Sequence, residues 1–291
     1  MAADAGVQVT ELGAEDHACL TFGESEELFD LTAAFVRDGL AAGLKVVWVS
    51  DAGPGQAAGE LGRRGVEVEA AMATGQMTAA SCEGRLLSGQ AFRADAAVGW
   101  LAGELASSGK QGFPGLRVAL DMSWALRPVA GIEELPQFEE GIAAALDGST
   151  AAVLCQYDRE RFDPVTLASV AGFHTRAVAA ATYYADALLR ICRQYAPPGI
   201  RIAGELDFQA ADPLGLALAE AIRLGGDIVV NMSALAFVDA RCTLMIADAA
   251  RTMAAKSRKV TLRCLPEVAA GFTRIGLNDI PGIRLVADGD R

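Results

Sequence analysis

The chain has 291 residues, of which 52% are hydrophobic and 6% aromatic, so it is long enough for two domains with aliphatic cores and is not a disordered chain. The formal net charge of −12 argues against sequence-independent binding to nucleic acid, which requires cations that neutralise phosphates. No apolar run approaches the roughly 18 residues of a membrane span. Residues 1–5 lack the features of a signal peptide, so we expect a cytoplasmic protein.

Short apolar runs alternate with amphipathic stretches in the first half of the chain. The runs cover residues 18–22, 46–49, 118–122 and 151–155, and the clearest amphipathic stretch covers residues 26–42. Such short, continuous runs are typical of strands that are buried on both faces of a parallel sheet. The alternation therefore predicts an α/β domain with helices on both faces. A long Ala-rich helix or helix pair is predicted over residues 164–195.

Pro197-Pro198-Gly199 is the clearest interruption in the chain, because prolines end a helix and glycine permits a turn. We therefore predict two domains, covering residues 12–196 and 199–291. Residues 199–291 carry 11 Lys and Arg and 11 Asp and Glu, so the whole acidic excess lies upstream. This difference in charge indicates that the two domains do different work.

The second half shows a smaller α/β pattern. Strands are predicted at residues 199–203, 207–208, 227–232, 260–263 and 283–286. Helices are predicted at residues 213–224, from just after Asp239 to about residue 255, and at residues 266–275. A unit of this size is an ordinary small domain.

The motifs of the second half resemble the STAS family of anti-sigma-factor antagonists. They are Gly204-Glu205-Leu206-Asp207, residues 227–233, Phe237-Val238-Asp239, and residues 260–263 and 272–277. The resemblance covers residues 199–288. It implies a domain that binds an anti-sigma factor or a related kinase-like regulatory protein.

The sequence departs from the STAS pattern after Asp239. The family has a phosphorylatable serine at this point, whereas this chain continues with Ala240, Arg241 and Cys242. We expect residues 239–242 to form a partner-docking turn that is not controlled by serine phosphate, and Asp239 to cap the following helix. Two nearby hydroxyls, Ser233 and Thr243, are candidate phosphorylation sites, but local hydrogen bonding is their favoured role.

The first half resembles the MEDS sensory domain, which is similar to a degenerate RecA/KaiC-type domain. The resemblance covers about residues 14–190 and is carried by residues 17–20, 35–40, 121–124, 154–158 and 161–164, and by His174. It implies a degenerate P-loop-like parallel-sheet domain that senses a small molecule or a metabolic state.

The loop that would hold a triphosphate in a P-loop protein is acidic in this chain. Residues 18–22 lead into Gly23-Glu24-Ser25-Glu26-Glu27, which has three glutamates and no lysine. Carboxylates repel a triphosphate, so an ATPase is not expected.

Eight residues of the first half are candidate ligand-binding residues. Cys19 and Cys155, with the two histidines of the chain, His17 and His174, could bind a transition metal, but buried thiols and a hydrogen-bonded histidine are the favoured interpretation. We therefore expect no metal and no cofactor. Trp124 and Tyr157 line a ligand pocket or belong to the core, and Asp121 and Asp158 contact the ligand or cap helices.

Two hypotheses of function follow. The first is a bacterial signal-responsive regulator whose sensory domain binds a small molecule and whose STAS domain switches between protein partners. The second is a metal- or nucleotide-dependent enzyme that uses the N-terminal fold. A homodimeric scaffold without a ligand is a third option. Direct DNA binding is not expected, because no basic patch or helix-turn-helix is visible.

Overall fold

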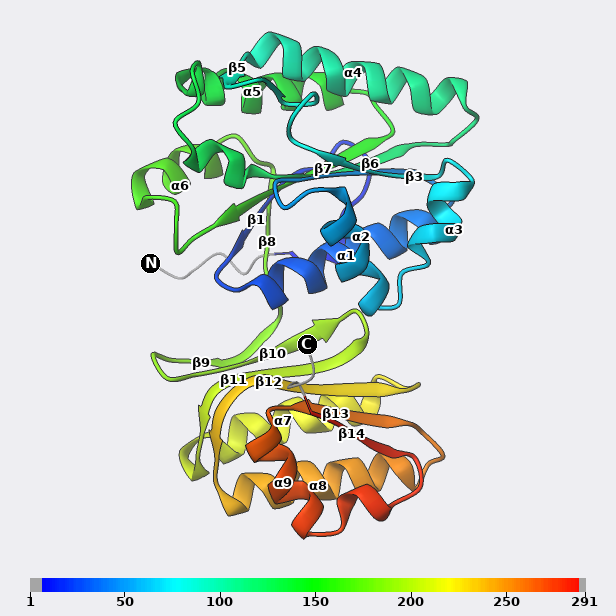
Figure 1. Cartoon of the computed structure of the whole chain (residues 1–291), viewed down its shortest axis with the longest axis vertical. Coiled ribbons are helices and arrows are strands. Elements are labelled where there is room, and N and C mark those ends of the chain that lie inside the picture. The colour runs from blue at the N-terminus through cyan, green and yellow to red at the C-terminus, as the bar shows by residue number, and fades with distance from the viewer. Residues whose placement is uncertain (1–6, 288–291) are drawn as a thin grey trace. The chain divides into compact units, whose positions relative to one another are not determined.

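Two six-stranded sheets organise the chain, each in a unit of its own, and the units divide between Ala179 and Ala180 (Figure 1). The computed structural model describes residues 7–287. The expectation about residues 1–5 concerns positions outside this range. None of the helices between residues 7 and 287 has the length and apolar character needed to cross a membrane.

The sheet of the first unit is entirely parallel. Its order is β3-β2-β6-β7-β1-β8. The strands are β1 (His17–Phe22), β2 (Lys45–Ser50), β3 (Met77–Ser81), β6 (Leu116–Asp121), β7 (Ala151–Asp158) and β8 (Arg176–Val178). Every residue of β2 and β6 is buried, as expected for central strands covered on both faces. The four predicted apolar runs are strands, and the predicted fold class is confirmed.

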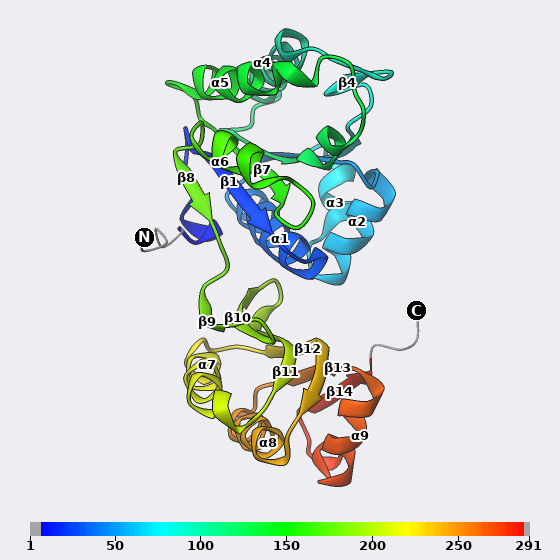
Figure 2. The same cartoon turned by 90° about the vertical axis from the view of Figure 1, so that its left-hand side faces the viewer.

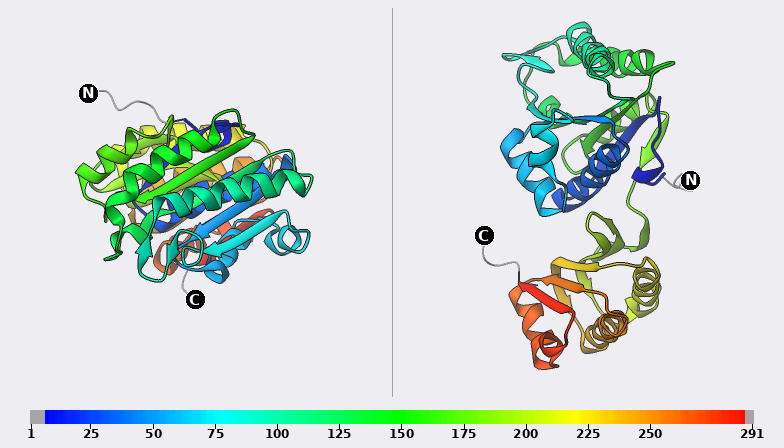
Figure 3. Two further views of the ribbon diagram at one scale, coloured as in Figure 1. Left: turned by 90° about the horizontal axis from the view of Figure 1, so that it is seen from above. Right: turned by 90° about the vertical axis from the view of Figure 1, so that its right-hand side faces the viewer.

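Helices cover both faces of this sheet (Figures 1 and 3). One face carries α1 (Ser25–Ala41), α2 (Pro54–Arg63) and α3 (Val68–Ala73). The other carries α4 (Ala94–Lys110) and α5 (Leu135–Leu146), which run side by side, with α6 (Pro164–Ala171) next to α5. A small hairpin of β4 (Leu87–Ser88) and β5 (Ala91–Phe92) precedes α4. The core under α4 and α5 is aliphatic, with a few large rings that include Phe92, Trp124 and Phe138.

The prediction of a long helix over residues 164–195 is wrong. Only α6 is helical in this stretch, and β8, β9 (Thr182–Ala185) and β10 (Leu189–Tyr195) follow it. Alanine has the highest helix propensity, but propensity contributes little energy per residue, and strand pairing overrides it here. β8 pairs with β1, and β9 pairs with β10.

The sheet of the second unit is mixed and has the order β14-β13-β12-β11-β10-β9. β9, β10 and β11 (Pro198–Leu206) are antiparallel, whereas β11, β12 (Ile228–Val238), β13 (Val260–Cys264) and β14 (Ile283–Ala287) are parallel. The helices α7 (Ala211–Arg223), α8 (Ala240–Ala254) and α9 (Pro266–Arg274) all lie on one face (Figure 2). Residues 207–208 were predicted as a strand but are not one, because Asp207 caps a short 3-10 turn at Phe208–Ala210 by accepting from the Gln209 amide at 2.9 Å.

The predicted boundary after residue 196 falls inside the second unit. Tyr195 pairs with Pro198 across a hairpin, so Ala196 and Pro197 form the turn between β10 and β11. Prolines mark tight turns as well as linkers, and the sequence does not distinguish the two. Gly199 permits the close approach of β11 to β12, because a Cβ at this position would overlap the carbonyl oxygen of Val229 on β12.

Candidate functional site

A buried polar cluster lies between the sheet of the first unit and α5. His17 comes from β1, Cys155 and Tyr157 from β7, Glu139 from α5, and His174 from the segment after α6. β1 and β7 are neighbours and pair Cys19 with Cys155, so alternate residues of both strands face the same helix. The exposed fraction of the His17, Glu139, Cys155 and Tyr157 residues is 0%, and that of the His174 side chain is 1%.

The carboxylate of Glu139 is the centre of this cluster. Its Oε2 atom lies 3.1 Å from His17 Nε2, 3.4 Å from His174 Nε2 and 3.6 Å from Cys155 Sγ. Its Oε1 atom accepts a short hydrogen bond from the Tyr157 hydroxyl. The carboxylate is therefore fixed at one oxygen and presents the other to the two imidazoles and the thiol.

Burial and charge act against each other in this cluster. Burial opposes ionisation of Glu139, but the His17 hydrogen bond and the nearby imidazoles hold its pKa below the usual range. Burial, helped by the Glu139 charge, raises the pKa of Cys155 well above its ordinary value. Burial also lowers the pKa of His174, against the attraction of Glu139. Burial therefore favours the neutral forms of the Cys155 thiol and the His174 imidazole, whereas the neighbouring side chains favour the charged form of the Glu139 carboxylate.

Glu139 was missed in the sequence analysis, although a signal was present. Leu135, Phe138, Ile142 and Leu146 form the buried stripe of α5, and Glu139 lies within that stripe. Its neighbour Glu140 is exposed, as a glutamate on a surface helix usually is. A carboxylate at a core position of an amphipathic helix is rare unless it has partners, so it indicates a buried polar site.

The structure brings together three of the four residues considered as metal ligands. The ligating atoms of His17, Cys155 and His174, together with a carboxylate oxygen of Glu139, all lie within 4.8 Å of one another. Cys19 is buried nearby on β1, but it does not belong to this group of four. Burial, with a smaller effect of the Glu139 charge, raises the pKa of the Cys19 thiol to about 12.

The remaining candidates of the first unit serve the core and the turns. Trp124 is fully buried, with its ring 4.6 Å from that of Phe92. Asp121 accepts from the amides of Ser123 at 3.0 Å and Asp51 at 3.1 Å. Asp158 accepts from the Glu160 amide at 2.9 Å. For these residues the structure favours the core and capping interpretations. Tyr157 combines both roles, because its buried ring ends in the hydroxyl that holds Glu139.

The loop after β1 binds the carboxylate of Glu27, at the start of the following helix. The Gly23 amide donates to Glu27 Oε2 at 3.2 Å, and Glu27 is 2% exposed. Arg159 Nη1 lies 3.5 Å from the same oxygen, and its guanidinium packs directly against Gly23. Backbone amides at the start of a helix that follows a strand can bind a phosphate. Here Glu27 and Arg159 already form an internal ion pair in that position.

A surface hollow lies beside the buried cluster. It is lined by residues that follow β6 and β7 and by α6, among them Leu126, Ile132, Arg161, Phe162 and Val170. Phe162 contacts the ring of Tyr157 with centroids 5.1 Å apart. The carbonyl oxygen of Val170 lies 2.7 Å from His174 Nδ1. Two lining residues therefore contact members of the cluster directly.

In the second unit, Asp239 caps α8, as predicted. Its Oδ1 atom accepts from the Cys242 amide at 2.7 Å. Ala240 and Arg241 are exposed, whereas Cys242 is buried and its thiol points to the carbonyl oxygen of Asp207 at 3.2 Å. Cys242 is therefore an internal residue of this turn, and only its neighbours are accessible to a partner.

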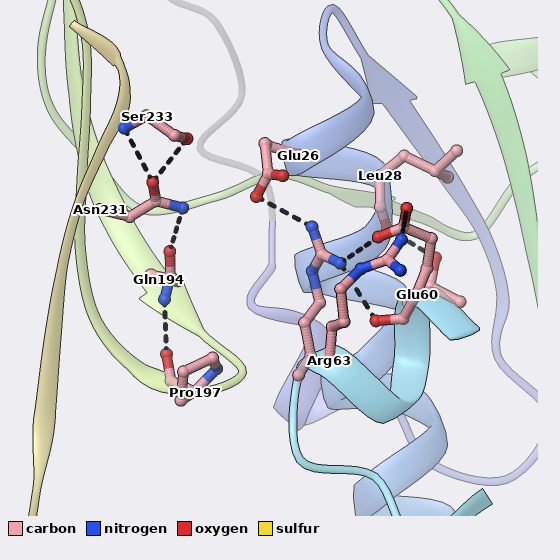
Figure 4. A network of polar contacts seen from close by, with 10 residues as sticks. Glu26, Leu28, Glu60, Arg63, Gln194, Pro197, Asn231 and Ser233 are labelled. Atoms are coloured by element: carbon pink, nitrogen blue, oxygen red, sulfur yellow. Dashed lines mark hydrogen bonds and ion pairs between the residues drawn. The ribbon is translucent and has the colours of Figure 1, made fainter. Parts of the chain in front are cut away.

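The two candidate hydroxyls form local hydrogen bonds. The Ser233 hydroxyl donates to Asn231 Oδ1 at 2.7 Å, and Asn231 donates to Gln194 Oε1 at 2.9 Å (Figure 4). The Thr243 hydroxyl donates to the carbonyl oxygen of Asp239 at 2.7 Å. These contacts agree with the structural roles expected from the sequence.

Large apolar side chains are exposed next to the Asp239 turn. Leu188 is 65% exposed, Phe208 60% and Phe237 51%. Leu188 and Phe237 line one hollow together with three acidic residues, Asp186, Glu205 and Asp207. Phe208 follows Asp207 in the chain. We call Leu188, Asp207, Phe208, Phe237 and Arg241 the β12–α8 face. Exposed apolar groups that border acidic ones are characteristic of a protein-binding surface.

Comparison with known proteins places two family models on the chain. Residues 16–175 match the MEDS family, described as the MEthanogen/methylotroph, DcmR Sensory domain. Residues 190–287 match the family described as "Mlab, STAS domain". The comparison with curated proteins gives no match.

Solved structures with similarity to the chain include a KaiC-like protein, a flagellar accessory protein and an anti-sigma factor antagonist. A KaiC-like protein from the hyperthermophilic archaeon Pyrococcus horikoshii is 11% identical over 66% of this chain and 79% of that chain, with a TM-score of 0.46. The flagellar accessory protein FlaH from Methanocaldococcus jannaschii is 9% identical over 65% and 83%, with a TM-score of 0.45. The anti-sigma factor antagonist SpoIIAA in its unphosphorylated form is 26% identical over 31% and 78%, with a TM-score of 0.26.

Proposed function

Because the chain belongs to the MEDS family and carries a STAS domain after the MEDS domain, we propose that it is a signal-responsive, non-catalytic regulator. In this proposal the MEDS unit senses a small molecule or a metabolic state, and the STAS unit binds an anti-sigma factor or a related kinase-like protein. The proposed location is the cytoplasm, where the six cysteines, which are all buried and form no disulfide with one another, remain reduced.

The observation that carries this proposal is the β12–α8 face. Its aromatic side chains, Phe208 and Phe237, are exposed although burial would be favourable, and acidic side chains surround the hollow between Leu188 and Phe237. A protein partner with an apolar centre and a basic rim would match this surface. Ala240 stands where the STAS pattern has a serine, so phosphorylation at that position cannot release the partner.

The hollow beside the polar cluster is the proposed signal site. It offers an apolar floor and is lined by charged side chains of both signs, Arg161 together with Glu133 and Asp163. A molecule that binds there would touch Phe162 and Val170, which contact Tyr157 and His174. Ligand binding would count as regulation only if it changed the affinity of the STAS unit for its partner.

The docking proposal predicts a loss of binding when the face is truncated. We expect the double variant Phe208→Ala with Phe237→Ala to bind an anti-sigma factor or kinase-like protein from the same genome at least about 10-fold more weakly than the wild type. Calorimetric titration of the purified proteins measures this. The control is Leu216→Ala on α7, which removes an apolar side chain that is 68% exposed and does not line the hollow. Equal binding by all three proteins would exclude the β12–α8 face as the docking site.

The non-catalytic proposal predicts that purified protein neither binds ATP tightly nor hydrolyses it. The physical reason is the Glu27 carboxylate, which accepts from the Gly23 amide and would repel a phosphate. Phosphate release in the presence of Mg²⁺ and ATP is the measurement. Turnover that disappears in Asp121→Asn would contradict the proposal and favour a nucleotide-dependent enzyme.

A further inference from the structure

The geometry points to a metal site: we propose that His17, Glu139, Cys155 and His174 bind one divalent transition-metal ion, with zinc as the best match to these donors. This proposal replaces the expectation of no metal, because Glu139 adds a fourth ligating group to the two histidines and Cys155. The inference concerns the first unit alone and does not depend on the proposed docking by the second.

Four of the six distances among the ligating atoms are close to those of a coordination shell, and all six are within 4.8 Å. Zinc binds nitrogen and oxygen at about 2.0–2.2 Å and thiolate sulfur at about 2.3 Å in a tetrahedron, which places ligand atoms about 3.3–3.6 Å apart. The observed distances from Glu139 Oε2 are 3.1, 3.4 and 3.6 Å to the atoms of His17, His174 and Cys155. Cys155 Sγ lies 3.5 Å from His17 Nε2.

The hydrogen-bond pattern leaves one imidazole lone pair without a donor. His174 Nδ1 faces the carbonyl oxygen of Val170 at 2.7 Å, and a carbonyl only accepts, so Nδ1 carries the proton. In the neutral ring, Nε2 is then an acceptor. It is buried without a hydrogen-bond partner and faces Glu139 Oε2, which is also an acceptor. A cation between these two atoms would satisfy both.

The outer contacts resemble those that orient ligands around metals. The Val170 carbonyl fixes the His174 ring, and the Tyr157 hydroxyl holds Glu139 by the oxygen that faces away from the imidazoles. Such partners set the tautomer of a histidine and the direction of a carboxylate. The donor set includes one thiolate, one carboxylate and two neutral imidazoles. Its formal charge of −2 would balance a divalent ion in a buried site.

Binding would change the protonation of two side chains. The Cys155 thiol would lose its proton to solvent as the metal–sulfur bond forms. The His17 proton that Nε2 directs at Glu139 would move to Nδ1, which frees the Nε2 lone pair for the metal. One proton would therefore be released for each ion bound.

The test is a titration of untagged, full-length protein that has been stripped with a chelator. Co²⁺ is the probe, because thiolate ligation gives it a charge-transfer band and tetrahedral geometry gives it intense visible absorption. We expect both signals to saturate at one equivalent, to disappear on addition of Zn²⁺, and to be accompanied by release of one proton. Wild-type protein without saturable absorption would overturn the proposal, whatever the variants do.

Variants locate the ion. Cys155→Ser should lose the charge-transfer band, and Glu139→Gln should weaken Co²⁺ binding by at least about 10-fold. The matched control is Cys82→Ser, which changes another buried thiol of the same unit that lies outside the group of four. An unchanged spectrum in Cys155→Ser would show that the ion binds elsewhere, and the proposed ligand set would be wrong. Failure of partner binding in the Phe208 and Phe237 variant is a separate result and leaves this titration unaffected.

Discussion

Gly199→Val is expected to unfold the second unit at a lower denaturant concentration while the first unit keeps its stability. Gly199 lies between β10 and β12, where it pairs with Gln194 and Val229. Any Cβ at this position would overlap the Val229 carbonyl oxygen, so the strands must separate or the backbone must distort. We expect a loss of about 3 kcal/mol or more in the free energy of unfolding.

The two units can be followed separately in this experiment. All three tryptophans, Trp48, Trp100 and Trp124, belong to the first unit, so tryptophan fluorescence reports that unit alone. Far-ultraviolet circular dichroism reports both. The control is Gly271→Ala on α9, where no atom lies within 4 Å of the added Cβ and the change should stay within about 1 kcal/mol. If Gly199→Val left the dichroism transition unchanged, residues 197–199 would act as a linker rather than as part of a sheet.

Glu139→Ala is expected to destabilise the metal-free first unit by about 3 kcal/mol or more. The substitution leaves the Tyr157 hydroxyl and the His17 Nε2 proton buried without their acceptor, and it opens a cavity under α5. Tryptophan fluorescence during denaturant unfolding of chelator-treated protein measures the change. The control is Glu140→Ala, which removes the adjacent carboxylate on the exposed side of the same helix and should change stability by less than about 0.5 kcal/mol.

Glu139→Gln separates the structural role of this residue from the proposed metal role. Its amide oxygen can still accept from Tyr157, and its two amide hydrogens can be donated to the Nε2 lone pairs of His174 and, once the His17 proton moves to Nδ1, of His17. The metal-free protein should therefore lose much less stability than Glu139→Ala does. The same variant should fail to gain stability when Zn²⁺ is added, whereas the wild type should gain it, because an ion that binds only the folded state stabilises that state. Equal stability losses in Glu139→Ala and Glu140→Ala would show that the buried carboxylate is not important for the fold.

The sequence contained much of the architecture, because local patterns record which faces are buried. The strands at residues 18–22, 46–49, 118–122 and 151–155 were visible as short apolar runs. In the second half, the order of helices and strands after residue 210 followed from the alternation of apolar runs and amphipathic stretches, whereas the strand predicted at residues 207–208 does not form. The capping role of Asp239 followed from its place before a helix. The three glutamates of residues 23–27 argue against the binding of a nucleotide triphosphate by this loop.

Only the tertiary structure showed where the units divide and what the polar cluster contains. Residues 164–195 are rich in alanine and predict a helix, but β8 pairs with β1, which is distant in sequence, and β9 and β10 pair successively with each other and with β11. Glu139 contacts the two histidines and Cys155 only because α5 packs on β1 and β7. Helix propensity and hydrophobic periodicity act over a few residues. The pairing of β1 with β8 and the contact of Glu139 with His17, by contrast, join residues that are more than a hundred positions apart in the sequence. The sequence by itself therefore determined the class of fold and the apolar faces, and long-range packing decided the unit boundary and the composition of the site.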